Sequence, residues 1–442
     1  MSLGNKEGRS LGLVELIAIA LGGMVGGGIF SILGISASMI GMVTPVAIII
    51  GGIIASFAAY AYVKLGLYYR DEGATYAFFK RTFPNSHFAA ASIGWITIFG
   101  YISTLSLYAY TFASYAISDS QYADNIWIRK GFSMLVLLIF TLINVWSVKG
   151  MGKVEDFMVY TKIVVLAIIS FILMKHGSTD IKTFLNVFKH DFEQSSVLSI
   201  LIVASITFVA YEGFQLVINA VNEMNNPEKN IPRAIYTAIF LAILIYVIIA
   251  FGALFAIPLE DLVKYKEYAL AAGAEKVLGN TGSFLVIFGA LLATSSAISG
   301  TIFGSSRQLA EIARDGYFHP YLKKRKPNGI PDNAIITMAS AAAVIILLGG
   351  LRLILEFGSI TFILVSLLMA YANYTIKDKT NSHNFATIIS IFGLFSAGCF
   401  ILYYEATHAP DQLLFIFFIY ILLAIGATYY ARKNKQKDLE ED

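Results

Sequence analysis

Two groups of residues could do chemistry because they interrupt long apolar segments. Five of the seven residues from Gly22 to Gly28 are glycine, and each glycine weakens a helix by about 1 kcal/mol relative to alanine. Glu212, followed by Gly213, lies inside another apolar segment, where an acid is costly unless it is paired or faces water. A broken helix exposes amides and carbonyls, which a membrane tolerates only where they line a cavity. We therefore predict that both interruptions face a cavity.

Both interruptions also have a structural interpretation. Gly22 and Gly26 show the small-xxx-small spacing of closely packed membrane helices, and Glu212 could lie near a membrane surface. However, three consecutive glycines exceed what one packing face requires, and Glu212 lies well away from both ends of its apolar segment, residues 196–221. We therefore favour a cavity position for both groups.

The chemistry expected at such a cavity is the binding of a zwitterion. A half-helix that begins near Gly27 directs free amides and a positive dipole end at the cavity, which suits a carboxylate. The carbonyl groups released at the two interruptions suit an ammonium group, and they belong to Gly22, Gly23, Met24, Phe208 and Val209. Such a site would bind an α-amino acid, and the aromatic residues expected to wall it are Phe30, Tyr108, Phe208 and Tyr211.

The elements that position these residues must lie in a membrane. The chain has 442 residues, of which 57% are hydrophobic and 14% charged, and its mean hydropathy is +0.70. A soluble protein cannot cover so much apolar surface, so the composition excludes a water-soluble enzyme, a nucleic-acid-binding module and a disordered chain. The one cysteine and the six histidines form no metal-binding pattern, and we predict neither a metal nor another cofactor.

Apolar stretches near the length of a bilayer predict an all-α membrane protein with about twelve spans. The two interruptions fall in spans one and six, as in transporters built from two inverted repeats. The expected organisation is a cytoplasmic leader (1–11), a first five-helix repeat (12–175), a second repeat with its connecting loop (176–374), two trailing helices (375–432) and a cytoplasmic tail (433–442). The expected spans are 12–40, 44–68, 88–118, 127–147, 155–175, 196–221, 232–257, 279–313, 332–350, 353–374, 384–404 and 411–431.

The distribution of basic residues predicts the orientation. If the N-terminus is cytoplasmic, the inside segments carry 21 Lys and Arg and the outside segments carry 9. This asymmetry predicts a multi-pass protein of the cell membrane with both termini in the cytoplasm. The basic tail then faces membrane lipid rather than nucleic acid, and the oligomeric state stays unknown at this stage.

Several other residues are assigned structural roles. All nine prolines are expected outside the span interiors, so breaks within spans must come from glycine or from polar insertions. The prolines expected to begin helices are Pro45, Pro232, Pro331 and Pro410. The charged residues with structural roles are Arg352 and Glu356 as an i,i+4 pair, Glu15 as a helix cap near Ser10, and Arg314 with Asp315 in a cytoplasmic loop.

Four elements of the sequence resemble those of the amino acid–polyamine–organocation transporters. Residues 26–30 (GGGIF) are similar to that family's G-[SG]-G-I-F element, and residues 208–214 (FVAYEGF) to its F-x-A-Y-x-G-F element. Residues 222–235 are similar to its E-x-x-N-P-x-x-x-I-P-R-A-I loop. Ser306-Arg307 and residues 313–316 (ARDG) are similar to its S-R and A-R-D-G element. The four elements occur in order over spans one to eight.

The resemblance implies the sodium-symporter-like (LeuT-like) fold, a 5+5 inverted repeat with helices 1 and 6 broken and two trailing helices. It also implies that the substrate carboxylate lies on the amides of Gly27 and Gly28. Many members carry an acid where Gln215 stands, so a pH role for that acid does not carry over to this chain. The resemblance places the amine on carbonyls of Met24, Phe208, Val209 and Glu212. The substrate-binding residues expected in all are Gly22, Gly23, Met24, Gly26, Gly27, Gly28, Phe208, Val209, Tyr211 and Glu212.

Lys162 lies inside the span 155–175 and has two interpretations. It follows Asp156 by roughly 9 Å of helix, so its side chain could snorkel to the cytoplasmic interface. In sodium-coupled relatives of this fold, a sodium ion joins helices 1 and 8 at this depth. The resemblance, which extends to archaeal proton-coupled members of broad specificity, implies that the lysine takes the ion's place. Because burial disfavours the charged form, we predict that Lys162 exchanges the coupling proton beside carbonyls near Gly22 and Gly23.

These features predict a secondary transporter that imports α-amino acids together with protons by alternating access. An amino acid exchanger or a polyamine carrier is the alternative within the class, and the single obvious cavity acid favours amino acids. A channel should show repeated filter segments, and none is apparent. A membrane sensor that binds amino acids should carry an output domain, for which both tails are short. A membrane enzyme is not expected, because no nucleophile–base pair or metal cluster is apparent.

Overall fold

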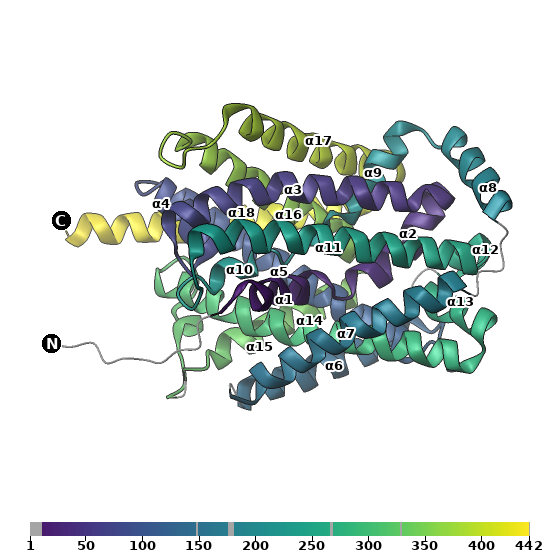
Figure 1. The fold of residues 1–442 in the computed structure, drawn as a ribbon. Coiled ribbons are helices and arrows are strands. Elements are labelled where there is room, and N and C mark those ends of the chain that lie inside the picture. The colour runs from purple at the N-terminus through teal and green to yellow at the C-terminus, as the bar shows by residue number, and fades with distance from the viewer. Residues whose placement is uncertain (1–10, 147–148, 176–180, 266–267, 328, 442) are drawn as a thin grey trace.

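The computed structural model describes residues 11–146, 149–175, 181–265, 268–327 and 329–441. Apart from one isolated β-bridge, these residues form helices and connecting turns (Figure 1). The elements in chain order are α1 (Leu13–Met24), α2 (Gly28–Ile40), η1 (Gly41–Val43), α3 (Thr44–Tyr69), α4 (Ala74–Thr82), α5 (His87–Ala116), α6 (Ile126–Trp146), α7 (Lys149–Lys175), α8 (Ile181–Gln194), α9 (Val197–Thr207), η2 (Phe208–Tyr211), α10 (Leu216–Asn219), α11 (Pro227–Ala256), α12 (Leu259–Lys264), α13 (Ala269–Leu278), α14 (Asn280–Arg314), η3 (Pro320–Lys323), α15 (Asp332–Leu348), α16 (Leu351–Thr375), α17 (Asn384–His408) and α18 (Pro410–Glu441).

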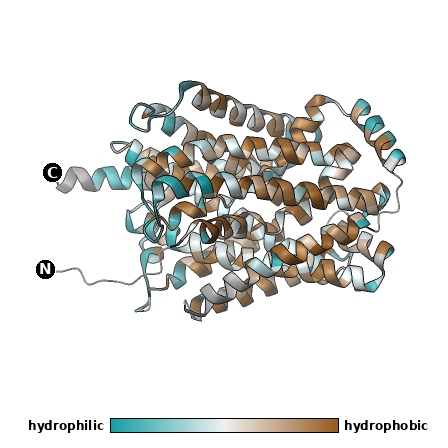
Figure 2. Ribbon diagram, in the orientation of Figure 1, coloured by the Kyte–Doolittle hydropathy of each residue, from teal (hydrophilic) through white to brown (hydrophobic). Residues whose placement is uncertain are grey.

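Ten helical segments of the described chain are long and apolar enough to cross a membrane. One of them, Gly28–Tyr69, combines the second half of the first expected span with the second span, and two shorter apolar helices, α1 and α15, complete the set. Figure 2 shows apolar residues along the middle of the helices and hydrophilic residues gathered toward their two ends. The protein is therefore an all-α, multi-pass membrane protein, as predicted from its composition.

Both predicted interruptions are present. The first lies between the end of α1 at Met24 and the start of α2 at Gly28. The second follows the end of α9 at Thr207, where a 3-10 turn and a non-helical stretch lead to the short α10. Gly22 and Gly23 lie in the last turn of α1 rather than in the break itself, which corrects their expected unwound position. Their carbonyl groups are still released, because the last carbonyls of a helix have no partner within it.

The seventh span begins earlier than predicted. α11 starts at Pro227, so Pro232 lies inside the helix and not at its first turn. Pro227 takes the first helical position, where a missing N–H costs nothing. Pro232 removes one hydrogen bond from the second turn, near the N-terminal end of α11. The other three prolines lie at helix starts as expected, since α3, α15 and α18 begin at or next to them.

The first broken span begins, and the sixth span ends, at the end of the molecule where the C-terminal helix finishes (Figure 1). Figure 1 places the start of α1, α4, α10 and the end of α18 at one end, and α8, α12 and α13 at the other. At the first end, Leu11 forms the isolated β-bridge with Met224, with Leu11 N donating to Glu223 O at 2.7 Å and Asn225 N donating to Leu11 O at 3.0 Å. The chain before α1 is thus joined to the chain after α10.

Candidate functional site

The carbonyl groups at the end of α1 bind side chains from three other helices. A carbonyl at a helix end lacks an amide partner in its own helix, and inside a membrane it must find another donor. The pairs, in chain order, are Lys162 Nζ on Gly22 O at 2.8 Å, Tyr108 Oη on Gly23 O at 3.4 Å, and Tyr246 Oη on Met24 O at 2.7 Å. The end of α1 is therefore held by α7, α5 and α11 through its own backbone.

Lys162 lies in the protein interior and does not snorkel. Its side chain is fully buried, and Nζ lies 2.8 Å from Gly22 O and 3.5 Å from Ser296 Oγ of α14. The predicted contact with a carbonyl at the end of α1 is confirmed. One ammonium group thus contacts both α1 and α14 from α7. The side chain of Asp156, from which the snorkelling distance was counted, lies outside the described residues.

The break of the sixth span is fixed by hydroxyl groups from neighbouring helices. Tyr246 Oη lies 2.8 Å from Ala210 O as well as 2.7 Å from Met24 O. Ser359 Oγ of α16 donates to Ile206 O, at the end of α9, at 2.6 Å. Tyr246 is fully buried, so a single hydroxyl group contacts the carbonyls of both broken helices.

The two breaks approach each other through glycine. Gly213 has φ +126°, a backbone conformation that side chains disfavour. A Cβ at Gly213 would lie 2.6 Å from Met24 N and 2.8 Å from Gly23 Cα, and a Cβ at Gly23 would lie 3.0 Å from Gly213 Cα. Only glycine at both positions allows this backbone contact.

Glu212 is held at the second break by Gln215. Its side chain is 5% exposed, and its Oε2 accepts a hydrogen bond from Gln215 Nε2 at 3.0 Å. Gln215 Oε1 accepts a hydrogen bond from Gly213 N at 3.0 Å, and Gln215 Nε2 also lies 3.5 Å from Tyr101 Oη. Gln215 therefore fixes the direction of the carboxylate. Within the described chain, no group of three or more His, Cys, Asp or Glu is placed to hold a metal ion.

A cavity of about 780 Å³ lies beside the two breaks. Gly22, Gly23, Glu212 and Ser296 line the deep part of this cavity, and Leu11 and Gln308 line it near one end of the molecule. These outer residues lie near the start of α1 and the end of α14, so the cavity opens at the end of the molecule where α18 finishes. Its volume exceeds that of an amino acid, and its charged lining residues, Glu15 and Glu212, are both acids.

The structure brings some of the predicted site residues to the cavity and leaves others away from it. Gly22, Gly23 and Glu212 line it. Tyr211 is directed elsewhere, because its hydroxyl donates to Ile48 O at 2.8 Å and its ring packs on Tyr246 at 5.3 Å. The other predicted residues that are absent from the lining are Met24, Gly26, Gly27, Gly28, Phe208 and Val209. Of the four aromatic residues expected to wall the cavity, Tyr108 lines it and Phe30, Phe208 and Tyr211 do not.

Tyr108 separates the glycine run from the cavity. A Cβ built on Gly26 would lie 2.8 Å from Tyr108 Cε1, and one on Gly27 would lie 3.1 Å from Tyr108 Cδ1 and 3.1 Å from Thr111 Cβ. The ring therefore lies directly against the break at Gly26 and Gly27.

Beyond the breaks, the path to the opposite end of the molecule is filled. Ser31 Oγ lies 2.5 Å from Thr111 Oγ1, and the Phe30 ring packs edge-on against Tyr115 at 5.3 Å. Farther out, Asp191 of α8 accepts a hydrogen bond from Met42 N at 3.0 Å. The molecule is thus open at one end and closed at the other.

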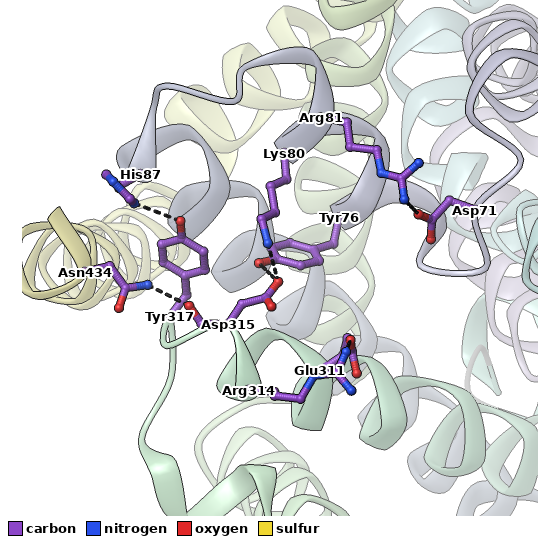
Figure 3. A network of polar contacts seen from close by, with 10 residues as sticks. All are labelled: Asp71, Tyr76, Lys80, Arg81, His87, Glu311, Arg314, Asp315, Tyr317 and Asn434. Atoms are coloured by element: carbon purple, nitrogen blue, oxygen red, sulfur yellow. Dashed lines mark hydrogen bonds and ion pairs between the residues drawn. The ribbon is translucent and has the colours of Figure 1, made fainter. Parts of the chain in front are cut away.

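The A-R-D-G element joins three helices at the open end, as expected for a loop-shaping role (Figure 3). Asp315 accepts hydrogen bonds from Tyr76 Oη at 2.7 Å and from Lys80 Nζ at 2.7 Å, both from α4. Its backbone carbonyl accepts from Asn434 of α18 at 2.7 Å, while Arg314 pairs within its own helix. Burial, and then the Asp315 carboxylate, raise the pKa of Tyr76 well above its usual value, so the hydroxyl stays a neutral donor.

Several residues of the site were not assigned to it from the sequence. Glu15 lies on the cavity wall, whereas its predicted partner Ser10 lies outside the described residues. Tyr246 and Ser296 are single polar residues within apolar helices, and such positions give little signal. Tyr101, which contacts Gln215, was also not assigned to the site. A polar residue facing a break could be found only by knowing which helices pack against it.

The comparisons with known proteins agree with this geometry. The sequence model of the amino acid permease family matches residues 11–436. The chain is 28% identical to an uncharacterised protein of Methanocaldococcus jannaschii, covering 92% of this chain and 91% of that protein. It is 31% identical to an inner membrane transport protein of Escherichia coli, covering 70% of this chain and 72% of that protein.

A mammalian relative carries a more specific name. The large neutral amino acids transporter small subunit 2 of Mus musculus is 28% identical, over 70% of this chain and 59% of that protein. Together with a family match over nearly the whole chain, two interrupted spans and a cavity between them, these comparisons establish that the chain belongs to the amino acid permease family and is a transporter rather than an enzyme.

Proposed function

We propose that the protein imports α-amino acids together with protons by alternating access. The observation that carries this proposal is the buried Lys162 ammonium on the carbonyl of Gly22. A cation fixed between α7, α1 and α14 supplies the positive charge that a bound sodium ion would supply in a sodium-coupled transporter. A lysine stays in place, but its proton can leave, so the natural coupling ion is the proton.

The coupling follows from what Lys162 contacts. When protonated, its ammonium group stabilises the end of α1 at Gly22 and reaches Ser296. When the proton leaves, the charge is lost and the ammonium contact with the carbonyl weakens. The two protonation states therefore favour different packings of α1, and a proton gradient across the membrane shifts the balance between them.

We propose that the substrate binds at the deep end of the cavity. Its ammonium group contacts the Glu212 carboxylate and the carbonyl of Gly23, whose hydrogen bond from Tyr108 is long at 3.4 Å. Its carboxylate binds the amides of Gly27 and Gly28, which a helix start leaves unpaired. In the present conformation Gly27 and Gly28 do not line the cavity and Tyr108 lies against Gly27, so in this proposal substrate binding includes a movement of this ring. The carbonyls of Met24, Phe208 and Val209 then shape the break behind the ligand.

The orientation supports an inward-open conformation. The asymmetry of Lys and Arg predicts that both termini lie in the cytoplasm, and the cavity opens at the end of the molecule where α18 finishes. We propose that the protein resides in the cell membrane, with lipid around its spans. Residues 12–175 and 176–374 would form the two five-helix repeats that move against each other, with 375–432 as trailing helices.

The same cavity also allows other transport modes, which the experiment below distinguishes. Glu15 and Glu212 both line the cavity, and two acids also suit a polyamine. An amino acid exchanger would use the same site without Lys162 exchanging a proton. An amino-acid-binding membrane sensor would bind the ligand at the same place without moving it.

The test is uptake of a labelled panel of amino acids and polyamines into proteoliposomes, with pH and sodium gradients imposed separately. We expect sodium-independent accumulation of α-amino acids driven by an inward proton gradient. Lys162→Ala should fold and bind but lose that accumulation. The matched control is Lys175→Ala, at the exposed end of the same helix, which should accumulate normally.

Each other result rejects a defined part of the proposal. A sodium requirement, or full proton-driven accumulation by Lys162→Ala, rejects Lys162 as the coupling group. Uptake that requires a counter-substrate inside the liposome identifies an exchanger. Uptake of polyamines alone rejects the amino acid substrate, and ligand binding without any uptake identifies a sensor.

A further inference from the structure

A second buried group of charges lies at the opposite end of the molecule from the cavity mouth. Arg352 and Glu356 lie in the first two turns of α16, and Glu405 lies in the last turn of α17, next to the start of α18. Because α18 finishes at the cavity end, these residues lie at the other end of the spans. They take no part in the substrate site described above.

The predicted i,i+4 pair accounts for only part of this group. Arg352 Nε donates to Glu356 Oε1 at 2.7 Å, and its Nη2 donates to Tyr404 Oη of α17 at 2.7 Å. Glu356 is 1% exposed and Glu405 is fully buried, whereas the Arg352 side chain is 40% exposed. One guanidinium group therefore stands beside two buried carboxyl groups.

Three oxygen atoms of this group have no hydrogen-bond donor. They are Glu356 Oε2 and both carboxyl oxygens of Glu405, and all are buried. Arg352 brings the two carboxyl groups together at the α16–α17 contact, because it bonds both Glu356 and Tyr404, the residue before Glu405, and the two carboxyl groups also interact electrostatically. Two carboxylates can only accept hydrogen bonds, so they bond to one another only when one of them carries a proton.

The ionisable neighbours do not remove the excess negative charge. The ionisable neighbours of Glu356 and Glu405 are Arg352 of α16 and Tyr404 of α17. The His408 ring stacks on Tyr404, with ring centroids 4.7 Å apart. α9 has no ionisable side chain, and α3 has none before Tyr60. α18 begins with Asp411, another acid. Two carboxylates with one guanidinium would leave a buried, unpaired charge, which costs several kcal/mol.

We propose that Glu356 and Glu405 form a binding site for one proton, which they share, and that this proton locks α16 to α17. The shared proton joins Glu356 Oε2 to one oxygen of Glu405, so that two of the three orphan oxygens gain a hydrogen bond. It also reduces two negative charges to one, which Arg352 neutralises. The exposed part of Arg352 connects the site to solvent. This proton site is separate from Lys162, which lies in α7 and contacts the end of α1.

The lock acts close to the second break. Ser359, within one turn of Glu356, donates to Ile206 O at the end of α9. Gly358 packs against the break, since a Cβ there would lie 3.3 Å from Val209 Cγ2. A proton that fixes α16 on α17 therefore fixes one wall of the sixth-span break, and its loss frees that wall.

The experiment compares the full-length protein with Glu405→Gln in detergent by infrared difference spectroscopy and by thermal unfolding as a function of pH. We expect the carboxylic-acid C=O band of the wild type at neutral pH to be lost in Glu405→Gln, because the glutamine amide replaces the shared proton. The folded wild type binds a proton that the unfolded chain releases near pH ~4.3. Its melting temperature should therefore fall as pH rises above that value, and this fall should be smaller in Glu405→Gln.

The controls separate the pair from other acids. Glu193→Gln, an exposed acid of α8, should keep both the band and the full fall in melting temperature. If Glu405→Gln fails to fold, Glu356→Gln tests the same site, since its amide can donate to Glu405. Identical carboxylic-acid bands and identical pH profiles in the wild type and the folded variant would overturn the proposal.

Discussion

Backbone atoms supply much of the polar surface near the breaks, and side chains decide which of them stay available. Lys162 and Tyr246 occupy the carbonyls of Gly22 and Met24, while Gly23 has only a long contact with Tyr108. Glu212 adds a carboxyl group to the lining of the same cavity as Gly23. At the scale of single residues, we therefore expect the proposed site to prefer a ligand with an ammonium group at this point.

Removing the charge of Glu212 should weaken substrate binding without unfolding the protein. Glu212→Gln keeps an oxygen that can accept from Gln215, so the local structure should persist. A hydrogen bond to a charged group contributes about 1.5–3 kcal/mol, so the substrate Kd should rise about tenfold or more. Calorimetric binding of the best substrate of the uptake panel measures this, with Glu15→Gln at the cavity mouth as the milder comparison. Unchanged affinity in Glu212→Gln would place the amine elsewhere.

A side chain at Gly213 should destabilise the contact between the two breaks. Gly213→Ala places a Cβ 2.6 Å from Met24 N at φ +126°, and a strained backbone of this kind costs about 1–3 kcal/mol. We expect a lower melting temperature and loss of substrate binding. The matched control is Gly398→Ala in α17, whose Cβ would make an ordinary contact at 3.6 Å with Ile363. An equal melting temperature in the two variants would contradict the close approach.

At the scale of helices, α11 contacts both broken spans through one side chain. Its Tyr246 contacts Met24 O of the first span and Ala210 O of the sixth. A hydroxyl has one proton, so it shares that proton between two acceptors or serves them in turn. α11 can therefore favour a conformation in which both carbonyls lie within reach of the Tyr246 hydroxyl.

Tyr246→Phe tests this role. The change removes the hydroxyl that contacts both carbonyls and leaves buried acceptors unsatisfied, at a cost of about 1–3 kcal/mol. We expect a lower melting temperature together with a slower transport cycle. Tyr236→Phe, on a more exposed part of α11, should leave both unchanged. Equal melting temperatures and equal uptake rates in the two variants would show that the hydroxyl is dispensable.

The sequence predicts the elements better than their contacts. The glycine run and Glu212 indicate the two breaks because both are local departures from an apolar pattern, and the buried contact of Lys162 with the end of α1 is also predicted correctly. Tyr246 gives no such signal, since it is one of 25 tyrosines, most of which are compatible with packing or a membrane interface. The contact of Tyr108 with Gly26 and Gly27 belongs to one conformational state. A transporter adopts several states, so its sequence does not specify this contact alone.

At the scale of the whole molecule, the cavity opens at the end where α18 finishes, as far as the described residues go. Gln308 lines it near the end of α14, whereas Ser120 lies exposed at the other end, between α5 and α6. Asp315 joins α4, α14 and α18 around the open end. The open conformation therefore has its own set of stabilising contacts.

Thiol labelling tests both the orientation and the open conformation. In a Cys399→Ala background, which removes the one native cysteine, Gln308→Cys should react with a membrane-impermeant reagent from the cytoplasmic face. Bound substrate should slow this reaction. Ser120→Cys should react only from the outside. Labelling of both positions from the same face would contradict the proposed topology.

The β-bridge between Leu11 and Met224 bears on how tightly the cycle is coupled. It ties the chain before α1 to the chain after α10, while Gly23 and Gly213 touch at the other end of the same two half-helices. In the proton-coupled cycle proposed above, a proton crosses without substrate if the half-helix beside Lys162 moves while the half-helix beside Glu212 does not. Because the two half-helices are linked at both ends, we expect them to move as one body and this leakage to be disfavoured.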